Sequence, residues 1–126
     1  MATTAEIQQA LAHGQTIDIT TTGRRSGAAR RIEIVFHNID GRLIISGIPR
    51  PNKRDWLLNL EADPHMIFHL KADVQADLPA TARIITDEAE RRTVLTAVAR
   101  NWKRDDLEAM VRDSPLIEVN IDDRTL

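Results

Sequence analysis

The chain has 126 residues, 42% of them hydrophobic and 29% charged, with a formal net charge of −2 and no cysteine. This length and composition predict one globular domain over residues 1–126, and the absence of cysteine excludes disulfide or thiolate chemistry. No apolar run reaches the ~20 residues of a membrane span, and residues 1–4 lack a signal-peptide pattern. We therefore expect a cytoplasmic protein without a membrane span.

Charge is distributed unevenly along the chain. Residues 20–54 carry eight basic and two acidic side chains, a net charge of +6, whereas the rest of the chain has a net charge of −8. A basic segment in an otherwise acidic chain indicates a local anion-binding site rather than a general polyanion-binding surface.

The first half of the chain predicts one helix and three strands. Thr3 and Glu6 form a capping box for a helix over residues 4–12. Apolar residues alternate with polar ones over 17–19 and again over 32–36, which predicts two strands. An Asp-Gly turn then leads into a third strand over residues 42–46.

The middle of the chain predicts a loop, a helix and a strand. Two prolines and a glycine exclude regular structure over residues 46–52. A helix over 54–62 follows, with Trp56, Leu57 and Leu60 on its buried side. Pro64 ends this helix, and an alternating pattern predicts a strand over 65–71.

The last third predicts two strands and two helices. A strand over residues 80–85 precedes a helix over 87–100, which Thr86 is expected to cap. Asp105 and Glu108 read as a capping box for a short helix ending near residue 113, and a final strand covers 116–121. About six strands without regular βαβ alternation predict an α+β fold built on an antiparallel barrel.

The segment of residues 20–31, TTTGRRSGAARR, is the strongest candidate for a binding loop. Its threonines favour a strand, and its glycines permit the positive φ angles of a tight turn. Backbone amides in such a turn can surround an anion, and arginines supply paired donors that match phosphate or carboxylate oxygens. The alternative is a hairpin turn with solvated arginines.

A second basic cluster, Arg50, Lys53 and Arg54, stands at the start of the helix that carries Trp56. Helix N-termini already attract anions, so basic residues there indicate a phosphate shared with the 20–31 loop. The alternative is that acidic neighbours such as Asp55 and Glu61 pair with these side chains on a solvated helix.

The usual catalytic groups are missing. The chain has no Cys and no Tyr, and its three serines lie outside any nucleophile motif. His65 and His69 lie four strand residues apart, about 13 Å, which is too far to share a metal ion. His13 and His37 are expected at the surface. A basic turn without a catalytic side chain therefore suggests a protein that positions a phosphorylated cofactor, and the cofactor carries the reaction.

Several short motifs, in a fixed order, resemble one known family. They are TTGRRSG at residues 21–27, Gly47 and Pro49, Arg54-Asp55-Trp56, and Asn59-Leu60 with Ala62 and Pro64. Together they resemble the deazaflavin-dependent nitroreductase/quinone reductase family, most closely over residues 20–70. The resemblance implies a flavin-reductase-like split β-barrel of about six mainly antiparallel strands with short flanking helices.

The resemblance also implies an activity and a set of binding residues. Members bind a reduced deazaflavin coenzyme and pass its hydride to a small electron acceptor such as a quinone or a nitroaromatic compound. By this resemblance, the phosphate and acidic tail of the coenzyme would contact Arg24, Arg25, Ser26 and Gly27. The tricyclic ring would lie against Ser46, Gly47, Ile48 and Pro49. The phosphate side would be completed at the helix by Arg50, Lys53, Arg54, Asp55 and Trp56.

Other interpretations stay open at this point. FMN, whose phosphate suits the same arginines, is the alternative cofactor, and a carrier that binds cofactor or lipid without turnover is a further alternative. A single-stranded nucleic acid site needs exposed aromatic residues, and both Phe36 and Phe68 are expected in the core, so no nucleic acid partner is expected. The tyrosines that serve the family as proton donors have no counterpart here, so water or an unidentified side chain supplies the proton. Val35, on the polar side of its strand, suggests a homodimer.

Overall fold

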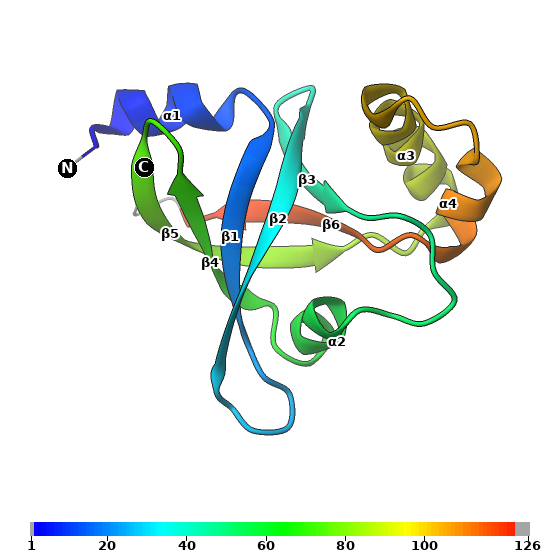
Figure 1. Ribbon diagram of the computed structural model, residues 1–126, viewed down its shortest axis with the longest axis horizontal. Coiled ribbons are helices and arrows are strands. Elements are labelled where there is room, and N and C mark those ends of the chain that lie inside the picture. The colour runs from blue at the N-terminus through cyan, green and yellow to red at the C-terminus, as the bar shows by residue number, and fades with distance from the viewer. Residues whose placement is uncertain (1, 123–126) are drawn as a thin grey trace.

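A computed structural model describes residues 2–122 and shows six antiparallel strands closed into a barrel, in the order β1-β2-β3-β6-β5-β4 (Figure 1). The strands are β1 (Gln15–Thr22), β2 (Ala29–Ile39), β3 (Arg42–Ser46), β4 (His65–Lys71), β5 (Gln75–Ile84) and β6 (Leu116–Ile121). The predicted α+β fold with an antiparallel six-stranded barrel is confirmed.

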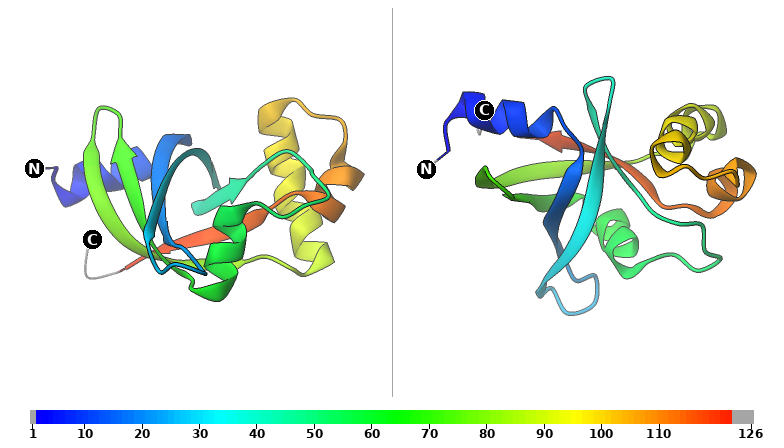
Figure 2. Two further views of the ribbon diagram at one scale, coloured as in Figure 1. Left: turned by 60° about the horizontal axis from the view of Figure 1, so that its bottom comes forward. Right: turned by 45° about the horizontal axis from the view of Figure 1, so that its top comes forward.

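Four helices flank the barrel: α1 (Thr4–Leu11), α2 (Asp55–Ala62), α3 (Glu88–Trp102) and α4 (Leu107–Asp113). Helices α3 and α4 lie side by side at one end of the molecule, and α1 lies at the other end (Figure 2). Helix α2 lies close to the long β1–β2 hairpin. Among residues 2–122, no helix is long and apolar enough to cross a lipid bilayer.

The two hairpins of the first half form as their sequence patterns predict. Strand β1 pairs with β2 in a register that places Ile17 opposite Ile34 and Ile19 opposite Ile32. Strands β2 and β3 meet at Asp40 and Gly41, which have φ angles of 53° and 86°. Two consecutive positive φ angles match the right-handed twist of the paired strands, which explains why Asp-Gly predicted this turn correctly.

The barrel interior holds the main apolar core. Phe36 and Phe68 are fully buried and meet edge to face, with 5.2 Å between their ring centroids. Ile7 and Leu11 of α1 join this core. A second apolar cluster joins α3 and α4 to the outer side of the barrel. It contains Ile44, Ile85, Val94, Leu95, Val98, Ala99, Met110, Val111 and Leu116.

The prediction for β5 is too short. The strand begins at Gln75, five residues before the predicted start, and pairs along its length with β4. Pro79 lies within it, opposite Ile67, and its carbonyl accepts a hydrogen bond from the amide of Asp122. The proline and the small alanines do not give the alternating apolar pattern that predicts a strand. Residues of this kind form a strand when neighbouring strands pair with them, because β-propensity depends on the surrounding sheet.

Two predicted helix caps are wrong. Helix α3 is capped by Asp87 rather than Thr86, and the Asp87 carboxylate accepts the Glu90 amide at 2.9 Å. The expected capping box of Asp105 and Glu108 does not form. Asp106 is the first residue before α4 instead, and its carboxylate accepts a hydrogen bond from Arg104, so a local ion pair replaces the cap.

His37 is also placed differently from the prediction. Its side chain is 5% exposed rather than at the surface, because α3 covers the outer face of β2 at this point. The imidazole packs edge to face against Trp102, with 4.9 Å between centroids, and its Nδ1 lies 3.4 Å from Asn101 Nδ2. Burial lowers the pKa of His37 below its usual value.

This burial predicts a pH dependence of stability. Because the pKa of His37 is lower in the folded chain, the unfolded chain binds a proton first as pH falls below about 6.5, and the free energy of unfolding then decreases. Urea unfolding at about pH 7.5 and about pH 5.5 should show this loss, and His37→Gln should reduce the difference. His13→Gln, at an exposed position, is the matched control. An equal loss in all three proteins would contradict the assignment to His37.

Candidate functional site

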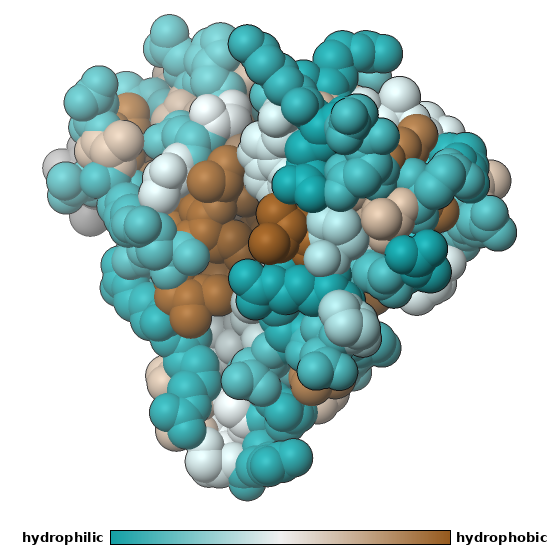
Figure 3. All heavy atoms as spheres, turned by 45° about the vertical axis from the view of Figure 1, so that its right-hand side comes forward, coloured by the Kyte–Doolittle hydropathy of each residue, from teal (hydrophilic) through white to brown (hydrophobic). Residues whose placement is uncertain are grey.

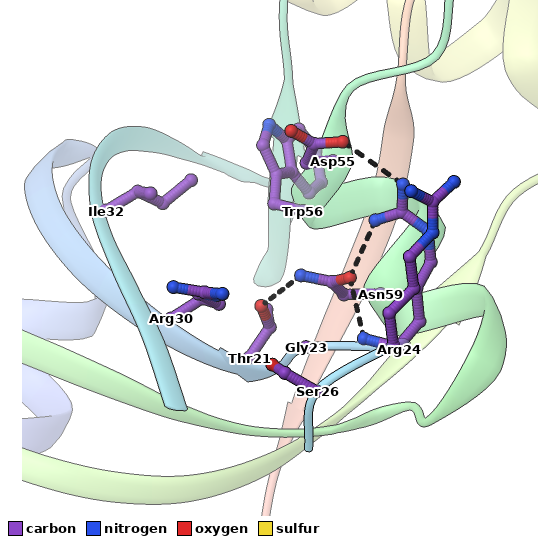
Figure 4. A pocket seen from close by; sticks show the side chains of 10 residues that line it. Thr21, Gly23, Arg24, Ser26, Arg30, Ile32, Asp55, Trp56 and Asn59 are labelled. Carbon is purple, nitrogen blue, oxygen red and sulfur yellow. Dashed lines mark hydrogen bonds and ion pairs between the residues drawn. The ribbon is translucent and has the colours of Figure 1, made fainter. Parts of the chain in front are cut away.

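A groove lies between the β1–β2 loop, strand β2 and helix α2. It encloses about 610 Å³. Its lining residues are Thr21, Gly23, Arg24, Arg25, Ser26, Arg30, Ile32, Asp55, Trp56 and Asn59 (Figure 4). The groove thus gathers the loop that the sequence singled out and the start of the helix that carries Trp56.

The loop from Gly23 to Ala28 is closed by its own backbone. The Gly23 amide donates to the Ala28 carbonyl at 2.8 Å, and the Gly27 amide donates to the Gly23 carbonyl at 2.8 Å. Gly27 has a φ of 72°, the left-handed conformation expected for this turn. A Cβ atom on Gly23 would lie 2.9 Å from Ser26 Oγ, so a larger residue at position 23 would require the Ser26 hydroxyl to move.

Asn59 joins the loop to α2. The side chain is 4% exposed, and its Oδ1 accepts hydrogen bonds from the Arg24 amide at 3.1 Å and from Arg24 Nη1 at 2.9 Å. Its Nδ2 donates to Thr21 Oγ1 at 3.1 Å. Figure 4 shows Asn59 between these two partners, so a single buried amide determines how the loop sits on the helix.

The arginines of the groove fall into two groups. Arg24 is held in place, because its Nη2 lies 3.2 Å from Asp55 Oδ1 in addition to the contacts with Asn59. Arg25 and Arg30 form no ion pair and donate no side-chain hydrogen bond within residues 2–122, although both line the groove. Ile32 and Trp56 add an apolar surface beside these charges. The groove therefore combines available cations with an apolar wall.

Arg50, Lys53 and Arg54 do not line this groove. They line a second cavity of about 280 Å³. Leu57 and Glu61 of α2 also face this second cavity, whereas Trp56 and Asn59 face the groove, so the two spaces lie on opposite faces of α2. The structure thus separates the two basic clusters into different cavities.

The charges of the second cluster are satisfied to different degrees. Lys53 pairs with Glu61 at 2.8 Å, which is the solvated-helix arrangement considered for this cluster. Arg54 Nη2 donates to the Ile48 carbonyl at 2.6 Å. Burial, together with the nearby charge of Arg50, lowers the pKa of Arg54. Arg54 therefore stabilises the Ser46–Pro49 loop through this hydrogen bond.

The Ser46–Pro49 loop leaves two backbone donors available. Ser46 is buried, and its hydroxyl donates to the Pro115 carbonyl at 2.7 Å. The amides of Gly47 and Ile48 donate to no other residue within 2–122. Figure 3 shows hydrophobic residues gathered in a hollow at the middle of the molecular surface, with hydrophilic residues around it. Residues 46–49 are not among the described residues that line the groove.

Sequence reasoning gave no binding role to Gly23 or to four further residues of the groove: Thr21, Arg30, Ile32 and Asn59. Asn59 had a signal that was available, since it follows Trp56 by three residues on the buried side of a helix. A polar residue in that position needs hydrogen-bond partners in the fold. The other three depend on the pairing of β1 with β2, which only the tertiary structure shows.

The histidine pair of β4 has ordinary hydrogen-bond partners. His65 is exposed and lies 2.9 Å from Asp63. His69 is buried between Thr20 Oγ1 at 2.7 Å and Asp77 Oδ1 at 2.6 Å. Both lie on a strand, as predicted.

The model of one protein family, described as F420H(2)-dependent quinone reductase, matches residues 1–124. Among solved structures, the conserved hypothetical protein Rv2991 of Mycobacterium tuberculosis is similar with a TM-score of 0.73 at 18% identity, covering 96% of this chain and 81% of that one.

Two further solved structures share the fold. The F420-H2 dependent reductase FDR-A gives a TM-score of 0.63 at 20% identity, covering 83% of this chain and 93% of that one. A protein described as a domain-swapped dimer gives a TM-score of 0.63 at 21% identity, covering 83% and 79%.

The role of Asn59 predicts a specific loss of stability. Asn59→Leu keeps the size of the side chain but leaves the Arg24 amide and the Thr21 hydroxyl without a buried partner, which should cost about 2 kcal/mol of unfolding free energy. Urea unfolding monitored by tryptophan fluorescence measures this loss. Glu61→Gln, on the same helix and in an exposed ion pair, should change stability by less than about 0.5 kcal/mol. Equal stability of Asn59→Leu and wild type would show that the hydrogen bonds of Asn59 are not required for folding.

Proposed function

Because the chain belongs to the F420H(2)-dependent quinone reductase family, whose coenzyme is the reduced deazaflavin F420, we propose that it reduces a quinone or a nitroaromatic compound beside α2. The family expected from the sequence motifs and the deazaflavin coenzyme are thereby confirmed. The observation that carries the proposal is the groove itself, where Arg25 and Arg30, which form no ion pair with any of residues 2–122, lie next to the apolar wall of Ile32 and Trp56.

The residues present fit such a coenzyme. Its phosphate and acidic tail need cations, and Arg24, Arg25 and Arg30 surround the groove together with the turn at Ser26 and Gly27. Its flat ring needs an apolar surface and hydrogen-bond donors for its oxygens. The free amides of Gly47 and Ile48 would supply these donors.

When bound, the reduced deazaflavin supplies the hydride for the acceptor. The chain itself contributes binding, orientation and a fixed electrostatic environment. Asp55 is the one carboxylate among the described residues that line the groove, and it pairs with Arg24. We assign the proton of the acceptor to solvent.

The groove predicts which arginines determine coenzyme affinity. Arg25→Ala and Arg30→Ala should each weaken binding of the deazaflavin coenzyme about tenfold to a hundredfold, because each removes a charge-assisted contact. Arg31→Ala is the matched control, since Arg31 is next in sequence but pairs with Asp18 at 2.9 Å and does not line the groove. Fluorescence titration measures all three, with thermal melts to check folding.

The same titration tests the choice of cofactor. FMN should bind more weakly than the deazaflavin coenzyme, and added salt should weaken binding of both because the contacts are partly exposed. Equal or tighter binding of FMN would contradict the preference for deazaflavin. Wild-type affinity in both Arg25→Ala and Arg30→Ala would remove the coenzyme from this groove. Turnover with a quinone and with a nitroaromatic compound then distinguishes the two acceptor classes.

We also propose that the protein forms a homodimer. One structural neighbour is a domain-swapped dimer, and the Val35 side chain of this chain is 36% exposed on β2. A two-fold symmetric interface uses the same surface of both copies, so Val35→Glu would introduce two charges into it and should shift the protein toward monomer. Light scattering coupled to gel filtration measures the mass. Thr96→Glu, at an exposed position on α3, should leave it unchanged, and a monomeric wild type would contradict the proposal.

A further inference from the structure

The second cavity contains a polar atom that the fold leaves without a partner. Ser114 follows α4, lines this cavity and is 4% exposed. Its Oγ is buried and has no hydrogen-bond partner within residues 2–122. Buried hydroxyl groups nearly always have a partner, so an unpaired one beside a cavity indicates that something else bonds to it.

The cavity also has a surplus of positive charge. Arg112 pairs with Asp113 at 2.9 Å, and Lys53 pairs with Glu61, so these four charges compensate one another. Arg50 and Arg54 have no carboxylate partner within residues 2–122, although both line the cavity. Desolvation is costly for a cation, and it lowers the pKa of Arg54. An anion in the cavity would offset this cost.

Arg91 adds a third positive charge; its guanidinium forms no ion pair within residues 2–122, although the nearby carboxylate of Asp113 attracts it. Its guanidinium donates four hydrogen bonds, all of them to backbone carbonyls. The acceptors are Ile85, Met110, Val111 and Ser114. These bonds hold the end of α4 against the start of α3, but neutral carbonyls do not cancel a full charge. Arg91 also lines the cavity, so its charge acts on whatever is bound there.

The remaining wall is apolar and defines the kind of anion. Leu57, Ile84, Ile85 and Leu116 line the same space. These side chains pack against the core, and an organic acid can place an apolar body against them while its carboxylate meets the arginines, which an inorganic ion cannot do. We propose that this cavity binds a small organic carboxylate, with its oxygens between Ser114 and Arg54 and its apolar body against these four side chains.

This site is separate from the coenzyme groove. The two spaces lie on opposite faces of α2, and the described residues that line one do not line the other. A carboxylate here and a coenzyme in the groove can therefore be bound at the same time. The proposal does not depend on reductase activity, and its test needs no coenzyme.

Benzoate is a suitable probe, with benzamide as its uncharged analogue and inorganic phosphate as an anion without an apolar body. Calorimetric titration should show binding of benzoate, and at least tenfold weaker binding of both others. In a ¹⁵N-resolved NMR titration, benzoate should shift the amides of residues 50–57, 84–86 and 112–116 and leave those of residues 21–30 unchanged.

Two variants identify the contacts. Ser114→Ala removes only the unpaired hydroxyl, so it should weaken benzoate roughly fivefold to tenfold without lowering the melting temperature. Arg54→Gln should weaken benzoate tenfold or more. Arg92→Gln is its control, because Arg92 lies on α3, pairs with Glu108 and does not line the cavity.

Ser114→Ala gives the decisive result of the two variants. Arg54 also holds the Ile48 carbonyl, so Ser114→Ala is the variant that does not disturb a structural contact. Wild-type affinity for benzoate in Ser114→Ala would overturn the proposal. So would equal binding of benzamide or phosphate, no binding of benzoate, or shifts confined to residues 21–30.

Discussion

The buried amide of Asn59 is the contact on which the groove depends. Its oxygen accepts two donors of Arg24 and its nitrogen bonds Thr21, so strand β1, the arginine loop and helix α2 meet at one side chain. The bond to Thr21 is buried and the two bonds to Arg24 are partly buried, and an unsatisfied partner there would be costly. This constraint holds Arg24 in place, whereas Arg25 and Arg30, which form no ion pair within residues 2–122, remain available to a ligand. A rigid support next to free charges is what a coenzyme site requires.

The remaining arginines show how the chain divides structural from available charge. Arg42 and Arg83 both bond Glu118 on β6 and Glu90 on α3, which ties that helix to the barrel. These contacts raise the pKa of both arginines and lower that of both glutamates, so all four stay ionised at neutral pH. Within the described chain, the arginines without such partners line the two cavities beside α2, except Arg100 on α3, which makes those cavities the candidate sites for anionic ligands.

Helix α2 has an unusual position because both of its faces border open space. Trp56 and Asn59 face the groove, whereas Leu57 and Glu61 face the second cavity, and Leu60 packs into the core between them. A helix of only eight residues can serve two sites because successive side chains point in directions about 100° apart.

The sequence by itself determined the strands that alternate clearly, the Asp-Gly hairpin, the order of elements and the arginine loop, because these follow from local patterns of three to ten residues. It also carried the motifs of the family. It could not show residues 75–79 of β5, where Pro79 lies in a strand only through pairing with β4, nor the burial of His37 under Trp102. The tertiary structure alone decided that Arg25 and Arg54 face different cavities. Both lie in loops next to α2, and the direction of each side chain depends on which face of that helix its loop packs against. This packing relates segments about 30 residues apart, so no local sequence pattern predicts it.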